Sequence, residues 1–328
     1  MKLKNSLYQI AILIGLISNI PSAQAATTPF IPQGGRLLII GQQRDTIDAY
    51  LDSIGTVPGG FMIYTSIQKM DGLDSPSRNY GAGINDAQYY INQYPNTVIQ
   101  LALYMVGALD DTLAGKYSKN ILKLAHWMKS VHCPIYFRIG YEFDLPENNY
   151  DPEKYQRVYR YIVDHLRAQG VNNVAYVWHT ACLTESQGNF LDWYPGDDYV
   201  DWFAVSLFNP MQIAVARKFS TIALVHKKPM MIAESTPAGL YSTNAKLEWF
   251  RHYFDFIKDE DVKVVCYINS NWNTYPLFKA INWGDARIQN DAAIKAMWLK
   301  ETGNGEFLQS STNLFNKLTD QYQWNPIN

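Results

Sequence analysis

Two glutamates, Glu142 and Glu234, each follow an apolar, strand-like run of residues and are the first candidates for catalysis. The first run begins at Ile135 and the second at Lys228. A carboxylate beside apolar neighbours loses hydration, so such a placement is costly and often marks a functional position. Two carboxylates that flank one bond are what hydrolysis of a glycosidic bond with retention requires. The alternative is that each Glu is a buried structural residue.

Short apolar runs rich in β-branched and aromatic residues recur along the chain and predict eight strands. They are Arg36–Ile40, Gly60–Thr65, Thr97–Met105, Ile135–Gly140, Val174–His179, Trp202–Phe208, Pro229–Glu234 and Val262–Asn269. Most are continuously apolar, which is typical of parallel strands that are covered on both faces. Helical patterns lie between most of these runs.

The clearest helical pattern follows the run that ends at Gly140. Asp151 is suited to cap this helix, and Pro152 and Glu153 suit its first turn. Gly170 is suited to end it. A last helix is predicted after the eighth strand, over Ile288–Lys300.

Eight strands that alternate with helices predict an α/β fold of the (β/α)₈ TIM-barrel class. A doubly wound open sheet is the alternative, but its usual Gly-rich turn is missing after the first run, at Gly41-Gln42-Gln43-Arg44. No linker divides the chain, so we expect one barrel over residues 26–300 and a tail, 301–328, that packs on the barrel or trails from it. In a barrel, Glu142 and Glu234 would end strands 4 and 7 at the same C-terminal mouth.

The first 25 residues have the order of a secretory signal peptide. Lys2 and Lys4 precede an apolar run over residues 10–17, and Ala23-Gln24-Ala25 is an A-x-A cleavage site. The apolar run is too short to span a bilayer, and no later run is longer than a strand. We therefore expect a secreted or periplasmic protein, cleaved near Ala25 and without a membrane span.

Composition narrows the partners and cofactors. The formal net charge of −2 argues against nucleic acid, because phosphate binding depends on clustered Lys and Arg. The 3 Cys and 6 His residues show no metal-ligand spacing, so we expect no metal and no cofactor. We also expect a monomer.

Five segments in the second half of the chain carry a resemblance to a known family. They are Phe137–Glu142, Tyr159–Arg167, Val174–Trp178, Tyr194–Asp201 and Lys228–Glu234. They resemble glycoside hydrolase family 26, which is best known for β-mannanases and includes some β-glucanases and xylanases. The resemblance covers about residues 130–275, and its most specific part is the Tyr-Pro-Gly-Asp-Asp-Tyr-Val-Asp segment that begins at Tyr194.

The resemblance implies a retaining, endo-acting β-glycoside hydrolase that cleaves a polysaccharide or oligosaccharide, with a β-mannan or β-glucan-like substrate. Glu142 corresponds to the acid/base and Glu234 to the nucleophile. Two departures stand out: the family has His where this chain has Tyr141, and it has an Asp and a nucleophile-binding Tyr where this chain has Ser206 and Phe208. Tyr141 is the expected substitute donor. An inactive sugar-binding barrel and a metal-dependent hydrolase are the alternatives.

Other polar and aromatic residues near the predicted strand ends are candidates for binding the sugar. They are Arg138, Tyr141, Trp178, His179, Asn269, Trp272 and Tyr104. Arg138 lies four residues before Glu142, on the same side of an extended strand, so its charge is expected near both carboxylates. The alternative for Arg138 is a core ion pair, and for Trp272 ordinary packing at the barrel rim.

Overall fold

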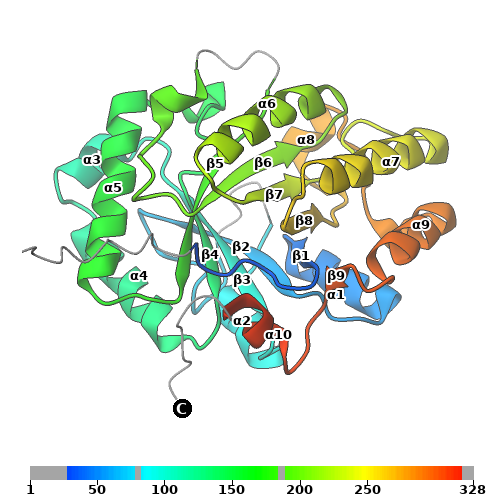
Figure 1. Cartoon of the computed structure of the whole chain (residues 1–328), viewed down its shortest axis with the longest axis horizontal. Coiled ribbons are helices and arrows are strands. Elements are labelled where there is room, and N and C mark those ends of the chain that lie inside the picture. Colours follow the sequence, from blue (N-terminus) through cyan, green and yellow to red (C-terminus); the bar gives the residue numbers. More distant parts are fainter. Residues whose placement is uncertain (1–27, 78–82, 184–188, 320–328) are drawn as a thin grey trace, which may run out of the picture.

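A computed structural model describes residues 28–77, 83–183 and 189–319 (Figure 1). Eight parallel strands form its barrel: β1 (Arg36–Gly41), β2 (Gly60–Ser66), β3 (Val98–Tyr104), β4 (Ile135–Ile139), β5 (Val174–Thr180), β6 (Trp202–Leu207), β7 (Met230–Ser235) and β8 (Val264–Ile268). Each strand pairs with its neighbours in chain order, and β1 pairs with both β2 and β8, which closes the barrel. The predicted (β/α)₈ barrel and its eight strands are confirmed.

The helices surround the barrel in Figure 1. They are α1 (Arg44–Ile54), α2 (Ala87–Gln93), α3 (Leu109–Leu113), α4 (Ser118–Ser130), α5 (Pro152–Ala168), α6 (Met211–Val225), α7 (Thr243–Asp259), α8 (Pro276–Ala280), α9 (Ala292–Thr302) and α10 (Leu314–Thr319). Between β5 and β6, the described residues contain a single 3₁₀ turn, Phe190–Trp193, in place of a full helix. The last predicted helix begins later than expected, at Ala292, because Asp291 accepts hydrogen bonds from Ala293 N and Ile294 N and caps it there.

Helix α5 illustrates how local sequence sets the outer layer. Asp151 caps the helix by accepting a hydrogen bond of 2.9 Å from Lys154 N, as predicted, and Pro152 occupies its first position. The apolar side chains at helical spacing are fully buried: Tyr155, Val158, Tyr159, Ile162, Val163 and Leu166. Gly170 follows the helix with a φ of 72°, a conformation that glycine adopts without steric cost.

Two apolar layers sandwich the strands. Alternate residues of β4 and β5 point inward, among them Tyr136 and Val177, and join the core inside the barrel. Their neighbours point outward, among them Phe137 and Trp178, and join the core beneath the helices. Because both faces are apolar, the continuous hydrophobic runs seen in the sequence are what this architecture requires.

The N-terminal end of the barrel is closed by segments from both ends of the chain. Phe30 is buried there, and its carbonyl oxygen accepts a hydrogen bond of 2.6 Å from the Tyr136 hydroxyl. The short strand β9 (Phe307–Leu308) pairs with β1, and Leu314 and Leu318 of α10 join the inner core. The barrel is therefore plugged at this end, and any substrate must approach from the other. The predicted signal peptide lies outside the described residues.

Within the described part of the chain, no helix combines the length and the apolar character needed to cross a bilayer.

Candidate active site

Glu234 points into the barrel because strand β7 contains one extra residue there. Ile232 pairs with Val205 of β6, but the next pair joins Glu234 to Ser206, so Ala233 has no counterpart. In an unbroken strand, Glu234 would alternate with the inward-facing Ala233 and point outward to the helices. A bulge of this kind turns a side chain to the other face. The irregularity therefore delivers the carboxylate to the mouth, which is the end of the barrel formed by the C-terminal ends of the strands.

The Glu234 carboxylate is buried and receives two strong donors on one oxygen. Arg138 Nη1, from β4, lies 2.5 Å from Glu234 Oε1 and forms an ion pair with it. The Tyr64 hydroxyl, from β2, donates to the same oxygen at 2.7 Å. Arg138 is fully buried, and its guanidinium lies 5.3 Å from the ring centre of Tyr64 and 5.3 Å from that of Tyr141. These contacts orient Oε1 toward the protein.

Glu142 lies beyond β4 rather than at its end, because the chain turns sharply after Ile139. Gly140 has a φ of 56°, and a Cβ there would lie 2.5 Å from Met105 Cε, so the turn requires glycine. Glu142 itself has a φ of 52°, which is unusual for a residue with a side chain. Its backbone carbonyl accepts hydrogen bonds from Leu145 N at 3.0 Å and Asn148 Nδ2 at 2.9 Å, which hold this conformation.

The loop that carries Glu142 is also tied to the end of β5. Phe143 N donates to the carbonyl oxygen of His179 at 3.0 Å. The buried carboxylate of Asp144 accepts hydrogen bonds from Thr180 Oγ1 at 2.6 Å and from Ala181 N at 2.7 Å. The position of Glu142 is thus defined by two neighbouring strands.

The carboxyl group of Glu142 is partly buried and accepts a hydrogen bond from a neighbouring strand. Ser206, from β6, donates to Glu142 Oε1 at 2.7 Å. Burial, and next the negative charge of Glu234, raise the pKa of Glu142 to about 8, whereas the Ser206 hydrogen bond and the positive charge of Arg138 oppose this rise. The group is therefore protonated at neutral pH and able to donate a proton.

Buried side chains connect the two carboxyl groups through a continuous set of hydrogen bonds. Ser206 Oγ lies 3.0 Å from His179 Nε2, and His179 Nδ1 lies 3.2 Å from Arg138 Nη1. Since Ser206 contacts Glu142 and Arg138 contacts Glu234, the two glutamates belong to one network. Burial, and next the charge of Arg138, hold the pKa of His179 well below its usual range, so its ring is neutral.

Most of the predicted sugar-binding residues occupy other roles in the structure. Trp178 is 0% exposed and stacks on Phe143 beneath the helices, with ring centres 4.5 Å apart, because its position on β5 points outward. Asn269 is fully buried, and its amide binds the backbone of Thr46 and Ile288 at 2.9 and 2.8 Å. Neither side chain is exposed to a substrate.

The remaining predicted residues divide between the network and its surroundings. Arg138 and His179 are fully buried members of the network, so they contact the carboxyl groups or Ser206 rather than solvent. Trp272 is 2% exposed, and its indole donates to Thr236 Oγ1 at 3.3 Å. Tyr141 packs its ring edge-on against Tyr64. Tyr104, at the end of β3, is half-buried.

Tyr64 is the residue that sequence reasoning missed. The expected substitute donor to Glu234 was Tyr141, whereas the structure supplies the hydroxyl from Tyr64 on β2. The signal in the sequence is a tyrosine that follows the apolar run Gly60–Ile63. That signal does not say which face of the strand the side chain occupies.

The segment with the most specific resemblance, Tyr194–Asp201, lies at the opposite end of the barrel, since it leads into the start of β6. Asp197 accepts hydrogen bonds from the Tyr194 hydroxyl at 2.6 Å and contacts His226 Nδ1 at 2.7 Å, and the Asp201 carboxylate accepts one from Tyr176 N at 2.7 Å. These contacts join loops at the N-terminal end, so the segment serves the fold.

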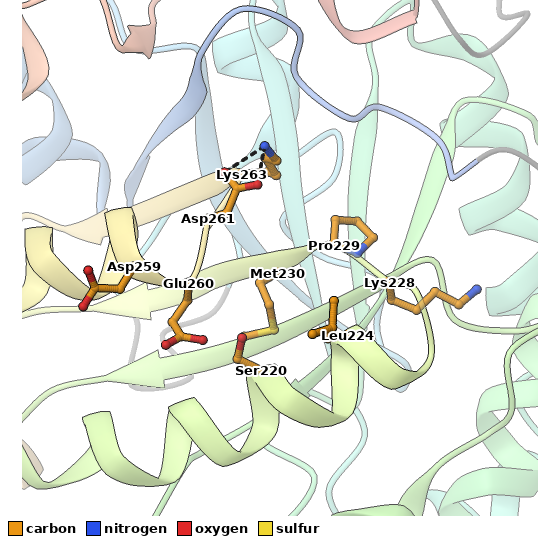
Figure 2. Close-up of a pocket in the computed structure, with 9 residues that line it drawn as sticks. All are labelled: Ser220, Leu224, Lys228, Pro229, Met230, Asp259, Glu260, Asp261 and Lys263. Carbon is orange, nitrogen blue, oxygen red and sulfur yellow. Dashed lines mark hydrogen bonds and ion pairs between the residues drawn. The ribbon is translucent and has the colours of Figure 1, made fainter.

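A pocket of about 320 Å³ also lies at the N-terminal end of the strands (Figure 2). Its lining comes from the start of β7 and the ends of α6 and α7: Ser220, Leu224, Lys228, Pro229, Met230, Asp259, Glu260, Asp261 and Lys263. Lys263 and Asp261 pair at 2.8 Å within it. Because Glu234 is at the other end of β7, this pocket is separate from the candidate active site.

Among the described residues, no group of three or more His, Cys, Asp or Glu side chains is arranged to hold a metal ion. The three cysteines, Cys133, Cys182 and Cys266, are buried and unpaired.

Comparison with known proteins assigns the family. The model of glycosyl hydrolase family 26 matches residues 102–279. A β-1,3-xylanase of a Vibrio species, TXYA, is 32% identical and aligns over 90% of this chain and 71% of its own length. A β-1,3-xylanase of an Alcaligenes species is 31% identical and aligns over 90% of this chain and 70% of its own length. The structure of a family 26 β-mannanase from Bacteroides ovatus has the same fold, with a TM-score of 0.62 and 17% identity over 89% of this chain and 95% of that one. The chain belongs to glycosyl hydrolase family 26 and is a glycoside hydrolase.

Proposed function

We propose that this protein is a retaining, endo-acting β-glycoside hydrolase in which Glu142 is the acid/base and Glu234 is the nucleophile. The observation that carries the proposal is the contrast between two carboxyl groups of one network. Glu142 has a raised pKa and is protonated at neutral pH, whereas Glu234 is an ion-paired carboxylate. A protonated carboxyl group beside a carboxylate that is held by an ion pair is what this chemistry requires.

In the first step, Glu234 attacks the anomeric carbon and forms a covalent glycosyl ester. Its attacking atom is Oε2, because Oε1 already binds Arg138 and Tyr64. As the bond to the leaving oxygen breaks, Glu142 transfers its proton to that oxygen. The donors on Oε1 orient the carboxylate so that its free oxygen faces the sugar.

In the second step, Glu142, now ionised, removes a proton from water, and the resulting hydroxide attacks the anomeric carbon. The ester bond breaks and Glu234 leaves as a carboxylate, so both residues return to their starting states. Two displacements at one carbon retain its configuration. This route predicts that the two carboxyl groups are about 5–5.5 Å apart, and a separation near 9 Å would indicate inversion instead.

The names of the relatives point to β-1,3-linked xylan as the substrate. Two proteins named β-1,3-xylanases align over 90% of this chain at 32% and 31% identity. The sequence resemblance to β-mannanases and β-glucanases leaves β-mannan and β-glucan as the other polysaccharides to test. The proposed substrate class is therefore a β-linked polysaccharide, with β-1,3-xylan first.

The test is to incubate the purified protein with β-1,3-xylan, β-1,4-xylan, β-mannan and β-1,3-glucan. Chromatography of the products identifies the substrate and separates endo from exo action, since endo action releases a mixture of oligosaccharides early. Proton NMR of the first product reports the anomer. Release of the α-anomer first would contradict a retaining β-glycosidase.

A sugar-binding barrel without activity is the alternative raised by the departures at Tyr141 and Phe208, and the Tyr64 hydroxyl on Glu234 argues against it. It predicts that the wild-type protein retains a polysaccharide on an affinity gel but releases no product. Turnover of any of the four polysaccharides would exclude it.

We also propose that the protein is exported. The Lys2/Lys4 region, the apolar run and Ala23-Gln24-Ala25 support cleavage near Ala25. Cleavage there would leave Phe30, which closes the barrel floor, in the mature chain. N-terminal sequencing of exported material should begin near Ala26, and Met1 at its start would contradict the proposal.

A further inference from the structure

The side chains that join the two candidate catalytic carboxyl groups are sealed from solvent. Arg138, His179 and Ser206 are each 0% exposed. Each therefore depends on its protein neighbours for hydrogen bonds, and the position of every proton follows from which groups can donate.

Arg138 determines which group donates in each hydrogen bond of the network. A guanidinium group is a donor only, so His179 Nδ1, at 3.2 Å from Arg138 Nη1, must be the acceptor. The ring is neutral, so its one proton is on Nε2, which donates to Ser206 Oγ at 3.0 Å. The Ser206 hydroxyl keeps one hydrogen, and Glu142 Oε1 lies 2.7 Å away to accept it.

We propose that His179 and Ser206 are positioning residues that hold Glu142 Oε1 as a hydrogen-bond acceptor and so confine the transferable proton of Glu142 to Oε2. The inference rests on the proposed role of Glu142 as acid/base. It extends that role, because it names the oxygen that donates and the residues that select it. Substrate contacts neither His179 nor Ser206, which act through Glu142.

Several charged and titratable groups face Glu142 and act on it together with Ser206. They are Glu234 of β7, Arg138 of β4, Tyr141, Asp144 and Tyr150 of the β4 loop region, and Cys182 after β5. The hydrogen bond from Ser206 stabilises the ionised form of Glu142 and lowers the pKa of Glu142. Removal of the Ser206 hydroxyl leaves the other groups in place.

The first experiment compares pH profiles of kcat/KM for the wild type and Ser206→Ala. We expect the alkaline limb of the variant to move to higher pH by about one unit, because Glu142 then keeps its proton longer. Ser235→Ala is the matched control: the hydroxyl of this serine on β7 contacts the Tyr253 hydroxyl of α7 at 2.8 Å and donates to Cys266 O at 2.7 Å. The alkaline limb of the Ser235→Ala profile should stay at the pH of the wild type. An unmoved limb in Ser206→Ala, or a downward shift, would overturn the proposal.

The second experiment reads the tautomer of His179 directly in the wild-type protein by two-bond ¹H–¹⁵N correlation. We expect a neutral ring protonated on Nε2, and a ring protonated on Nδ1 or on both nitrogens would overturn the proposal. Substitution of His179 assigns its signal. If that variant does not fold, the other five of the 6 histidines, all exposed or half-buried, can be assigned by their own substitutions.

Glu142→Gln separates failure of this inference from failure of the proposed function. If Glu142→Gln remains fully active on polysaccharide, the acid/base assignment is wrong, and the inference falls with it. If Glu142→Gln is inactive but Ser206→Ala keeps its alkaline limb, the acid/base assignment stands and the positioning role of Ser206 and His179 is refuted.

Discussion

The Tyr64 hydroxyl donates a hydrogen bond of 2.7 Å to Glu234 Oε1, although the two residues are 170 positions apart. Strands β2 and β7, which carry them, are separated in the sheet by β1 and β8, so only closure of the barrel brings them together. Phe208, which follows β6, offers no hydroxyl. The donor to the proposed nucleophile is therefore supplied from the other side of the barrel.

Replacement of Tyr64 by Phe should slow the first chemical step. A hydrogen bond to a charged group contributes about 1.5–3 kcal/mol, so we expect kcat on polysaccharide to fall by about 10- to 100-fold. KM should change little, because the hydroxyl contacts Glu234 rather than substrate. Steady-state kinetics on the preferred polysaccharide measure both quantities.

Tyr136→Phe is the matched control for Tyr64→Phe. Tyr136 is also a buried tyrosine inside the barrel, but its hydroxyl binds Phe30 O at the opposite end. Its loss should lower the free energy of unfolding by about 1 kcal/mol and leave kcat unchanged. Equal losses of kcat in the two variants would mean that Tyr64 acts through stability and not through Glu234.

The pH dependence should report the state of Glu142. The first step needs this group protonated, and its pKa is raised to about 8, so kcat/KM should hold at neutral pH and fall as the pH rises through about 8. Glu234→Gln removes the negative charge that raises this pKa, so the pKa of Glu142 should fall in that variant. Carbon-13 NMR of labelled carboxyl groups measures the pKa of Glu142 even in an inactive variant. An unchanged pKa in Glu234→Gln would contradict the electrostatic coupling of the two glutamates.

The two glutamates should differ in their response to the leaving group. Glu142→Ala should cripple hydrolysis of polysaccharide but spare aryl glycosides with good leaving groups, because these need no proton. Azide should partly restore its turnover by replacing the activated water. Glu234→Ala should abolish both activities, since no glycosyl ester can form.

Circular dichroism and thermal melting serve as the folding control for both glutamate variants. Equal loss of activity on an activated aryl glycoside would show that the roles are assigned wrongly. Full activity of both variants would place the active site elsewhere.

Trp178 should prove to be a core residue and not a sugar platform. It is fully buried against Phe143, Phe203 and Phe219, with ring centres 4.5–5.1 Å apart, so Trp178→Ala should lower the free energy of unfolding by about 3–5 kcal/mol. Trp283 is only partly buried, beside Phe208 at 4.9 Å, and Trp283→Ala should cost less stability. Denaturant unfolding compares the two. A stable Trp178→Ala variant with a raised KM would refute the core assignment.

Much of the barrel was predictable from local pattern. Continuous apolar runs separated by capped, amphipathic helices imply parallel strands that are covered on both faces, and all eight strands lie within two residues of the expected bounds at each end. The cap at Asp151 and the end near Gly170 follow from residue preferences that act over one helical turn. Such features depend on neighbours in the chain.

The fold class and the choice of Glu142 and Glu234 as candidates could be read from the sequence, because polar groups at the ends of apolar runs are visible in one dimension. Tertiary structure decided which side chains surround them. Both faces of each barrel strand are apolar, so the sequence carries no signal for which face is inward, and Trp178 turned outward. The extra residue in β7 that turns Glu234 inward exists only relative to β6, and the donors from Tyr64 and Ser206 come from strands that meet the glutamates through barrel closure.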